Sequence, residues 1–324
     1  KWFNKKVYTS ETQKGQVVLY NDTFAEYEEP QIAMAATVLL ERAGYEVVLV
    51  ENKVCCGRPM ISKGFLEQAR DNARQNIEAL LPYAEKGIPI IGIEPSCILT
   101  LRDDYRDLVP GQGSQRLADS VYMLEEFLAS RARAGDLDLG FNSVTRKLLL
   151  HGHCHQKALI GTAATREVLS LPAGFEVEEV ASGCCGMAGS FGYEKEHYEV
   201  SRIVGQERLF DVIEAQPAEV EVVAVGTSCR HQIADFTGRK ARHWAEVLLE
   251  ALNLYNRMVY MAFQVKKRGR VTYYYGGDRP TLSALVTEDL GNGDLKIYFA
   301  GLTGGYSAKG LLEREELVRM EPIK

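Results

Sequence analysis

Short apolar runs alternate with longer amphipathic stretches along the first third of the chain. The apolar runs predict strands, and the stretches with apolar residues at helical spacing predict helices; in chain order they cover 17–20, 30–43, 45–50, 65–81 and 88–93. Gly44 follows the first helix, where a helix C-terminus favours glycine, and Pro82 should end or kink the second. Strands that alternate with helices predict a parallel sheet covered by helices.

The same order of elements returns about 130 residues later. A strand at 147–150 leads into a short helix, and a strand, a helix and a third strand follow at 175–180, 197–215 and 220–225. The sequence therefore predicts an α/β protein of two repeats, whose parallel sheets face each other about a pseudo-twofold axis. Open α/β folds bind ligands beyond the carboxyl ends of their strands, so we expect the functional sites in or beside the cleft between the repeats.

All seven cysteines fall in register with this duplication. The equivalent positions of the two repeats are Thr23 and Cys154, Cys55-Cys56 and Cys184-Cys185, and Cys97 and Cys229. The gap before the double cysteine is 31 residues in the first repeat and 29 in the second, and the gap after it is 40 and 43. Cysteines that recur in register indicate a metal or redox site rather than seven unrelated core residues.

The arrangement of the cysteines favours metal binding over disulfides. An odd number with two adjacent pairs is a poor disulfide framework, because disulfide geometry fits badly across one peptide bond. We therefore expect free thiolates in a reducing, cytoplasmic compartment. The second repeat supplies four sulfurs, the number that a [4Fe–4S] cluster or tetrahedral zinc requires: Cys154, Cys184, Cys185 and Cys229. Adjacent ligands do not match the C-x-x-C knuckle of a common zinc site, so they favour a cluster of this or an unusual type.

Two local features support functional thiolates. Cys97 and Cys229 end tight turns that open predicted helices, where the helix dipole and free N–H groups stabilise a thiolate. Gly186, which follows the second double cysteine, lets the backbone approach the sulfurs and donate hydrogen bonds to them.

Charge and hydropathy narrow the class of partner. The chain has 324 residues and a net charge of −6, which argues against a nucleic-acid or anionic-membrane partner because both need a basic face. No apolar run approaches the roughly 18 residues of a membrane span. No secretory signal opens the chain, which begins at Lys1, so we expect a processed or altered start, or the back end of a longer polypeptide.

The composition changes after the second repeat. We expect a first repeat at 1–135, a second at 136–255, and a linker with a small antiparallel β module at 256–324. Strands of this module are expected at 271–275, 283–287 and 295–299, with a hairpin turn at Gly291-Asn292-Gly293 between the last two. The module contains no cysteine, histidine or recognisable motif.

Four motifs together resemble the cysteine-rich CCG domain family. They are Cys55-Cys56-Gly57-Arg58-Pro59, Glu94-Pro95-Ser96-Cys97, His151-Gly152-His153-Cys154-His155-Gln156-Lys157, and the run from Cys184 to Gly192. The resemblance covers about residues 15–252. The family includes the CCG-bearing component of heterodisulfide reductase and the iron–sulfur components of glycolate oxidase and anaerobic glycerol-3-phosphate dehydrogenase. The sequence is most similar to the C-terminal half of FAD-linked oxidase/iron–sulfur fusions.

This resemblance implies an oxidoreductase component that relays electrons from a flavin toward a quinone or other acceptor during oxidation of 2-hydroxy acids such as D-lactate, glycolate or 2-hydroxyglutarate. The chain has no flavin fingerprint and no ferredoxin-type cysteine run, so FAD and further iron–sulfur subunits would lie upstream or on partners. Any membrane association would be peripheral and through those partners. No catalytic residue is assigned on this chain.

The sequence departs from the family motif, which has a first cysteine, a double cysteine and a closing C-x-x-C. Thr23, Thr100 and Gln232 occupy cysteine positions, so neither repeat can bind the five-cysteine noncubane cluster that the complete motif implies. The second repeat keeps four cysteines, with His231 or His153 as an extra ligand or hydrogen-bond donor. In the first repeat Asp22, water or substrate would complete a site with Cys55, Cys56 and Cys97, unless that repeat is a degenerate scaffold.

Three alternatives to electron relay stay open at this point. A thiol or heterodisulfide reductase would use the cysteines of the first repeat around a bound substrate. A structural subunit would bind zinc in place of a cluster. A docking or assembly module would act through its C-terminal β segment.

Overall fold

The computed structural model describes residue 3 and residues 14–252, 283–289 and 295–300. The chain divides into two compact units, and residues 8–259 form the one that contains both repeats. A short hairpin belongs to the other unit. The expected strand at 271–275 and the expected turn at 291–293 lie outside the described residues.

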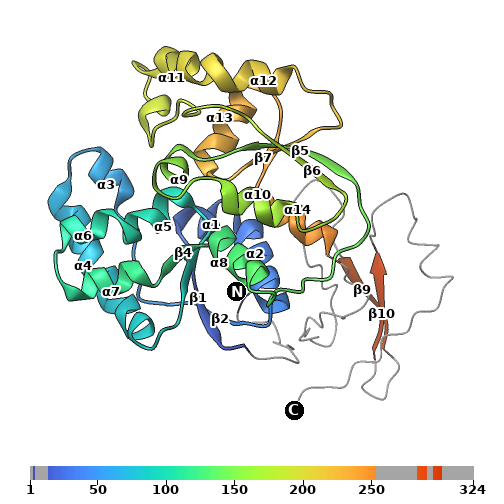
Figure 1. The fold of residues 1–324 in the computed structure, drawn as a ribbon, viewed down its shortest axis with the longest axis horizontal. Coiled ribbons are helices and arrows are strands. Elements are labelled where there is room, and N and C mark those ends of the chain that lie inside the picture. Colours follow the sequence, from blue (N-terminus) through green and yellow to red (C-terminus); the bar gives the residue numbers. More distant parts are fainter. Residues whose placement is uncertain (1–2, 4–13, 253–282, 290–294, 301–324) are drawn as a thin grey trace. The chain divides into compact units, whose positions relative to one another are not determined.

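The first repeat forms a four-stranded parallel sheet in the order β2-β1-β3-β4 (Figure 1). Its elements are β1 (Gln16–Tyr20), α1 (Thr23–Tyr27), α2 (Pro30–Arg42), β2 (Glu46–Val48), α3 (Arg58–Ser62), α4 (Leu66–Glu85), β3 (Ile90–Gly92), α5 (Pro95–Arg102), α6 (Asp104–Leu108), α7 (Gln112–Asp119), β4 (Val121–Met123) and α8 (Leu124–Arg133).

The second repeat forms another four-stranded parallel sheet in the matching order β6-β5-β7-β8. Its elements are β5 (Arg146–His151), α9 (Cys154–Leu159), α10 (Ala163–Leu169), β6 (Phe175–Glu179), η2 (Phe191–Tyr193), α11 (Tyr198–Gly205), η3 (Gln206–Phe210), α12 (Asp211–Glu214), β7 (Glu221–Ala224), α13 (Thr227–Thr237), β8 (Ala241–Arg242) and α14 (Trp244–Ala251). The two predicted parallel sheets and their duplication are confirmed.

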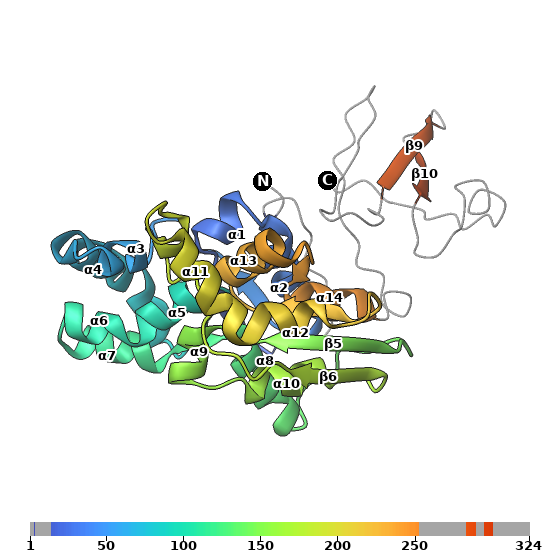
Figure 2. The same cartoon turned by 90° about the horizontal axis from the view of Figure 1, so that it is seen from above.

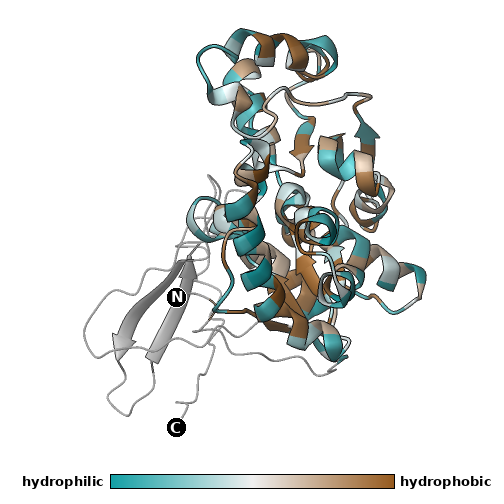
Figure 3. Cartoon of the chain, turned by 90° about the vertical axis from the view of Figure 1, so that its left-hand side faces the viewer, coloured by the Kyte–Doolittle hydropathy of each residue, from teal (hydrophilic) through white to brown (hydrophobic). Residues whose placement is uncertain are grey.

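Burial explains why each sheet forms. The central strands β1, β3, β5 and β7 are almost entirely buried and rich in aliphatic residues, as strands covered on both faces are. β6 lies at a sheet edge and alternates buried and more exposed residues, as a half-exposed strand does. Figure 3 shows this difference as largely brown central strands and more teal outer helix faces.

Helices pack across the boundary between the repeats. α8, which follows the last strand of the first repeat, packs against α10 of the second, and α14, which follows the last strand of the second repeat, packs against α2 of the first (Figures 1 and 2). Each repeat thus contributes the same two helices to this contact. The pairing is the one that a pseudo-twofold axis would produce.

Several boundaries differ from those predicted. Pro82 was expected to end or kink the helix near residue 81, but it lies inside α4, which continues to Glu85. β2 has three residues where six were expected. The short strands β4 and β8 and the helices α6 and α7 were not predicted.

The hairpin of the second unit pairs β9 (Ser283–Asp289) with β10 (Leu295–Ala300) in antiparallel register, with an irregularity between Lys296 and Ile297. The predicted antiparallel pair near the C-terminus is confirmed. Within the described part of the chain, no helix combines the length and hydropathy needed to cross a membrane.

Candidate metal centre

Every cysteine lies in a loop or helix start at the carboxyl end of a strand. Cys154 is the first residue of α9 after β5, the double cysteine Cys184-Cys185 follows β6, and Cys229 is the third residue of α13 after β7. The first repeat places its cysteines after β2 and β3 in the same way. All seven are free thiols, as the sequence predicts.

The four sulfurs of the second repeat form a chain of neighbours. Hydrogen bonds link Cys154 to Cys184, Cys184 to Cys185, and Cys185 to Cys229. The pKa of Cys184 is lowered because the Cys154 and Cys185 thiols donate to its sulfur, and the pKa of Cys229 is lowered chiefly by donation from Cys185. Two of the four sulfurs are therefore favoured thiolates.

A backbone loop holds the Cys184 sulfur. The Gly186 N–H points at it over 3.3 Å, and the Ala188 N–H also lowers the pKa of this thiol. Ala188 has φ of 42°, in the left-handed region that costs a residue with a Cβ about 1–2 kcal/mol. The chain therefore accepts local strain where its N–H groups converge on a sulfur.

A buried polar network fixes this loop from behind. The Gly186 carbonyl accepts a hydrogen bond from Ser201 Oγ at 2.8 Å, and Ser201 Oγ accepts one from Gln232 Nε2 at 2.6 Å. Gln232 stands where the family motif has its last cysteine and is 1% exposed. Its amide supports the loop in place of a fifth sulfur.

His151 approaches the cysteines more closely than the sequence predicted. Its Nδ1 bonds Ser182 Oγ at 2.8 Å, which leaves the buried Nε2 with the Cys229 sulfur as its neighbour. The ring contributes to the lowered pKa of Cys229 after the larger effect of Cys185. His151 was not among the predicted site residues, and the sequence signal for it was the row of three histidines around Cys154.

The two histidines predicted as ligands or donors have other partners. His153 is the N-cap of α9, and its Nδ1 accepts the His155 N–H at 3.2 Å. His231 bonds the Tyr193 hydroxyl through Nδ1 at 3.0 Å and lies 3.4 Å from Glu28 through Nε2. Both rings are near the cysteine loops and are committed to holding them in place.

The first repeat repeats the arrangement with one sulfur fewer. Hydrogen bonds link Cys55 to Cys56 and Cys56 to Cys97, and Thr23, which stands where the second repeat has Cys154, bonds to Cys55. The pKa of Cys55 is raised by its bond with Cys56 and by burial. The pKa of Cys97 is raised to about 11, since burial and the nearby Asp22 and Glu94 outweigh the bond from Cys56.

Asp22 is a buried acid beside this first group. Its Oδ1 caps α1 by accepting the Phe24 and Ala25 N–H groups, and its Oδ2 has no hydrogen-bond partner. Burial, with Glu94 nearby, raises the pKa of Asp22 to about 7. The side chain is therefore an oxygen donor of the kind expected to substitute for the missing cysteine.

The two cysteine groups meet at the boundary between the repeats. α5, which carries Cys97, packs against α9, which carries Cys154. Lys63, just after α3, pairs with Glu194 of the loop that follows Gly192. Both contacts join segments of the two repeats that adjoin the double cysteines or the cysteine helices.

The spread of the sulfurs bears on the kind of metal. Zinc–sulfur bonds of about 2.3 Å in a tetrahedron bring ligand sulfurs to about 3.8 Å from each other. Among the described residues, one group of three possible metal ligands has its ligand atoms within 4.8 Å of one another, and it consists of Asp103, Asp104 and His155. No three cysteine sulfurs of the described residues lie that close together.

The acidic group at Asp103, Asp104 and His155 has its own explanation. Arg58 donates two hydrogen bonds to Asp104, at 2.9 and 3.1 Å. Burial and the nearby Arg58 lower the pKa of His155. The group is a partly exposed ion pair beside the first double cysteine.

Comparison with known proteins agrees with the geometry. The cysteine-rich domain family (CCG) matches residues 20–102 and 149–234, which together make up more than half of the chain. One component of the anaerobic glycerol-3-phosphate dehydrogenase of Escherichia coli (strain K12) is 30% identical over 253 residues, 78% of this chain and 63% of that protein. D-2-hydroxyglutarate dehydrogenase of the same strain is 29% identical over 242 residues, 74% of this chain and 23% of that protein.

Lactate utilization protein A of Bacillus licheniformis is 26% identical over 245 residues, 72% of this chain and 98% of that protein. The chain spans less than two thirds of the glycerol-3-phosphate dehydrogenase component and about a quarter of the D-2-hydroxyglutarate dehydrogenase. It covers nearly all of the lactate utilization protein.

Proposed function

The chain belongs to the cysteine-rich CCG domain family, and on that premise we propose that it is an iron–sulfur electron-relay component of a flavin-dependent dehydrogenase of 2-hydroxy acids. The names of its relatives, two dehydrogenase components and a lactate utilization protein, support this class of reaction. The observation that carries the proposal is the convergence of four cysteines at the carboxyl ends of three neighbouring strands, with Cys154 after β5, Cys184-Cys185 after β6 and Cys229 after β7.

The residues proposed to hold the cluster are Cys154, Cys184, Cys185 and Cys229. A [4Fe–4S] cluster or a variant of it would supply one-electron transfer at this site. The Gly186 and Ala188 N–H groups donate toward the Cys184 sulfur, and such donors stabilise added negative charge. The adjoining buried residues keep water away from Cys185 and Cys229, which are 3% and 1% exposed.

Cys55, Cys56 and Cys97 are proposed as a weaker site. All three thiols have raised pKa values, so thiolates there are disfavoured until a metal binds. Asp22 is the oxygen ligand available to complete a site with them.

The proposed partners follow from what the chain lacks. A flavin domain or subunit would deliver electrons, and other iron–sulfur subunits and a quinone or similar acceptor would receive them. Seven free thiols fit a reducing compartment, and we propose the cytoplasm.

We also propose the domain boundaries 1–135, 136–255 and 256–324. α8 ends at Arg133 and β5 begins at Arg146, so the first boundary falls between complete repeats. α14 ends at Ala251, just before the second.

A matched pair of double variants tests the proposal. Anaerobically purified protein should contain about four iron and four sulfide per chain from the second repeat. Cys184→Ser with Cys185→Ser should abolish this iron and its electron paramagnetic resonance signal, whereas Cys55→Ser with Cys56→Ser should keep both. Zinc without sulfide, or equal loss in the two variants, would contradict a cluster in the second repeat.

A further inference from the structure

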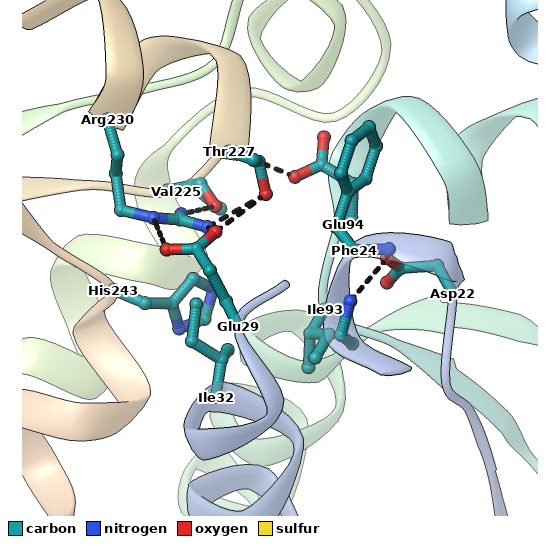
Figure 4. A pocket seen from close by; sticks show the side chains of 11 residues that line it. Asp22, Phe24, Glu29, Ile32, Ile93, Glu94, Val225, Thr227, Arg230 and His243 are labelled. Atoms are coloured by element: carbon teal, nitrogen blue, oxygen red, sulfur yellow. Dashed lines mark hydrogen bonds and ion pairs between the residues drawn. The ribbon is translucent and has the colours of Figure 1, made fainter. Parts of the chain in front are cut away.

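The Glu94 carboxylate accepts hydrogen bonds from the first turns of two helices, α5 and α13. It follows β3 as the N-cap of α5, and its side chain is 4% exposed. One carboxylate oxygen, Oε1, accepts the Ser96 N–H at 3.2 Å and the Ser96 hydroxyl at 2.6 Å. The other, Oε2, accepts the Thr227 N–H of α13 at 2.8 Å, as Figure 4 shows.

These two helices carry equivalent cysteines. Cys97 is the third residue of α5 and Cys229 is the third residue of α13. A single carboxylate from the first repeat therefore caps the cysteine helix of each repeat. Because Cys229 is one of the proposed cluster ligands, the cap reaches into the metal centre of the second repeat.

The second repeat lacks a cap of its own at this point. Gly226 is the N-cap of α13 and has no side chain to accept a hydrogen bond. Glycine is required there, because a Cβ at Gly226 would lie 2.3 Å from Cδ2 of His153. The packing of His153 therefore leaves no room for a capping side chain at position 226. The missing acceptor is supplied by Glu94, which occupies the equivalent position in the first repeat.

A second carboxylate of the first repeat holds the same helix turn. Glu29 accepts the Thr227 hydroxyl at 3.0 Å and the Arg230 Nε–H at 3.0 Å, and also pairs with the Arg230 terminal nitrogen. The Arg230 guanidinium, 5% exposed, donates to the Ala224 and Val225 carbonyls as well. The first turn of α13 is therefore fixed to the first repeat through polar contacts that are shielded from water.

We propose that Glu94 is a positioning residue that holds Cys229 in place for the cluster of the second repeat. This inference rests on the proposed function and extends it, since it gives the first repeat a role that needs no fourth cysteine. The first repeat holds the start of the cysteine helix of the second through the hydrogen bond between Glu94 and the Thr227 N–H, which we call the clamp. The carboxylate also lies at the positive end of the α13 dipole, where its negative charge favours the oxidised cluster.

Two substitutions remove the clamp in different ways. Glu94→Gln keeps the size but replaces one acceptor oxygen by a donor amide. Thr227→Pro removes the N–H that Glu94 accepts, together with the hydroxyl, and proline at the first position of a helix is well tolerated. Pro95 occupies the same position in α5, so this variant copies the first repeat. Thr227→Ala, which keeps the N–H, is the control for the lost hydroxyl.

Glu126→Gln is the matched control for Glu94→Gln. Glu126 caps α8 by accepting the Met123 N–H at 3.0 Å and pairs with Arg102, so all these contacts stay within the first repeat. A general loss of stability from a missing helix cap would appear in this variant too.

The primary readout uses the metal-free protein. Iodoacetamide labelling followed by peptide mass spectrometry should show Cys229 alkylated about tenfold faster in Glu94→Gln and Thr227→Pro than in Glu126→Gln and Thr227→Ala, with the rate at Cys154 unchanged. In iron-loaded protein, both variants should show a broadened resonance, and Glu94→Gln, which removes the carboxylate charge, should also show a higher reduction potential. Unchanged labelling of Cys229 in both clamp variants would overturn the positioning role.

The two proposals fail separately. If the wild-type chain binds no cluster, the proposed function fails while the labelling experiment still tests the clamp. If the cluster is present and Cys229 labels at wild-type rates in both clamp variants, the function stands and the role of Glu94 does not.

Discussion

Gly57 and Gly186 occupy the same position after the two double cysteines but meet different surroundings. Both have positive φ, 87° and 97°. A Cβ on Gly57 would lie 3.5 Å from its nearest neighbour, which is an ordinary contact, whereas a Cβ on Gly186 would lie 2.1 Å from the Ser201 carbonyl oxygen. The first glycine is needed for its backbone conformation alone, and the second also for space.

Alanine at these two positions separates the effects. Gly57→Ala should lower the free energy of unfolding by about 1–2 kcal/mol, the cost of a Cβ in the left-handed region. Gly186→Ala should cost roughly twice as much or more, since overpacking adds about 1–3 kcal/mol, and should also reduce iron content because the loop that binds Cys184 must move. Denaturant unfolding and iron analysis check both. Equal losses in the two variants would contradict the crowding at Gly186.

His151 is the second residue whose role is testable by itself. In His151→Phe the ring nitrogen that faces Cys229 is lost. A net hydrogen bond is worth about 1 kcal/mol, and for a one-electron couple this corresponds to about 40 mV. The reduction potential of the cluster should therefore fall by about that amount, because a donor to sulfur stabilises the reduced state.

Ser182→Ala is the graded control for His151→Phe. It keeps the ring but removes the hydroxyl that bonds Nδ1 at 2.8 Å and orients it. Its potential should lie between those of the wild type and His151→Phe in a redox titration followed by electron paramagnetic resonance. A potential that rises, or stays unchanged, in His151→Phe would exclude a hydrogen bond from His151 to Cys229 in the cluster-bound protein.

At the scale of elements, the long periodic segments were predictable and the short ones were not. Enough turns to show a helical period are present in α2, in α4 and in the helical run from α11 through α12. The repeated cysteines also indicated that the order of elements in the first repeat returns in the second. β4 and β8 have three and two residues, too few for a pattern to emerge. The parallel sheets followed from the alternation of elements, but their last strands did not.

The candidate site was predictable as a set of cysteines and not as a set of contacts. The register of Cys55-Cys56 and Cys184-Cys185 was enough to expect sites at the strand ends. The approach of His151 to Cys229, and the cap that Glu94 provides to α13, join residues 78 and 133 positions apart. Such contacts depend on how two repeats pack, and no local pattern carries that information.

At the scale of the whole molecule, the packing of the two repeats includes a buried acid. Glu125, in α8 of the first repeat, is fully buried and accepts hydrogen bonds from Gln156 Nε2 at 2.6 Å and from Thr165 Oγ1 at 3.2 Å, both in the second repeat. Burial raises the pKa of Glu125 to about 8. The folded protein therefore keeps this carboxyl group protonated to a higher pH than an exposed glutamate would be.

This raised pKa fixes the sign of a pH effect on stability. Between the unfolded value near 4.5 and the folded value near 8, the folded chain keeps a proton that the unfolded chain has lost. The free energy of unfolding should therefore fall as pH rises through this window, by at most about 1.4 kcal/mol per pH unit, and should be unaffected by this group below it. Asp22, with a pKa raised to about 7, acts in the same direction between about pH 4 and 7.

Glu125→Gln isolates the contribution of the interface. The neutral amide cannot ionise, so the free energy of unfolding of the variant should decline much less than that of the wild type between pH 5 and 8. The variant should therefore become steadily more stable relative to the wild type as pH rises. Glu126→Gln, one residue along and paired with Arg102, leaves Glu125 in place and should keep the wild-type slope. Denaturant unfolding at a series of pH values measures all three proteins. Parallel curves for the wild type and Glu125→Gln would mean that the carboxyl group is ionised at neutral pH, held there by the hydrogen bonds across the repeats.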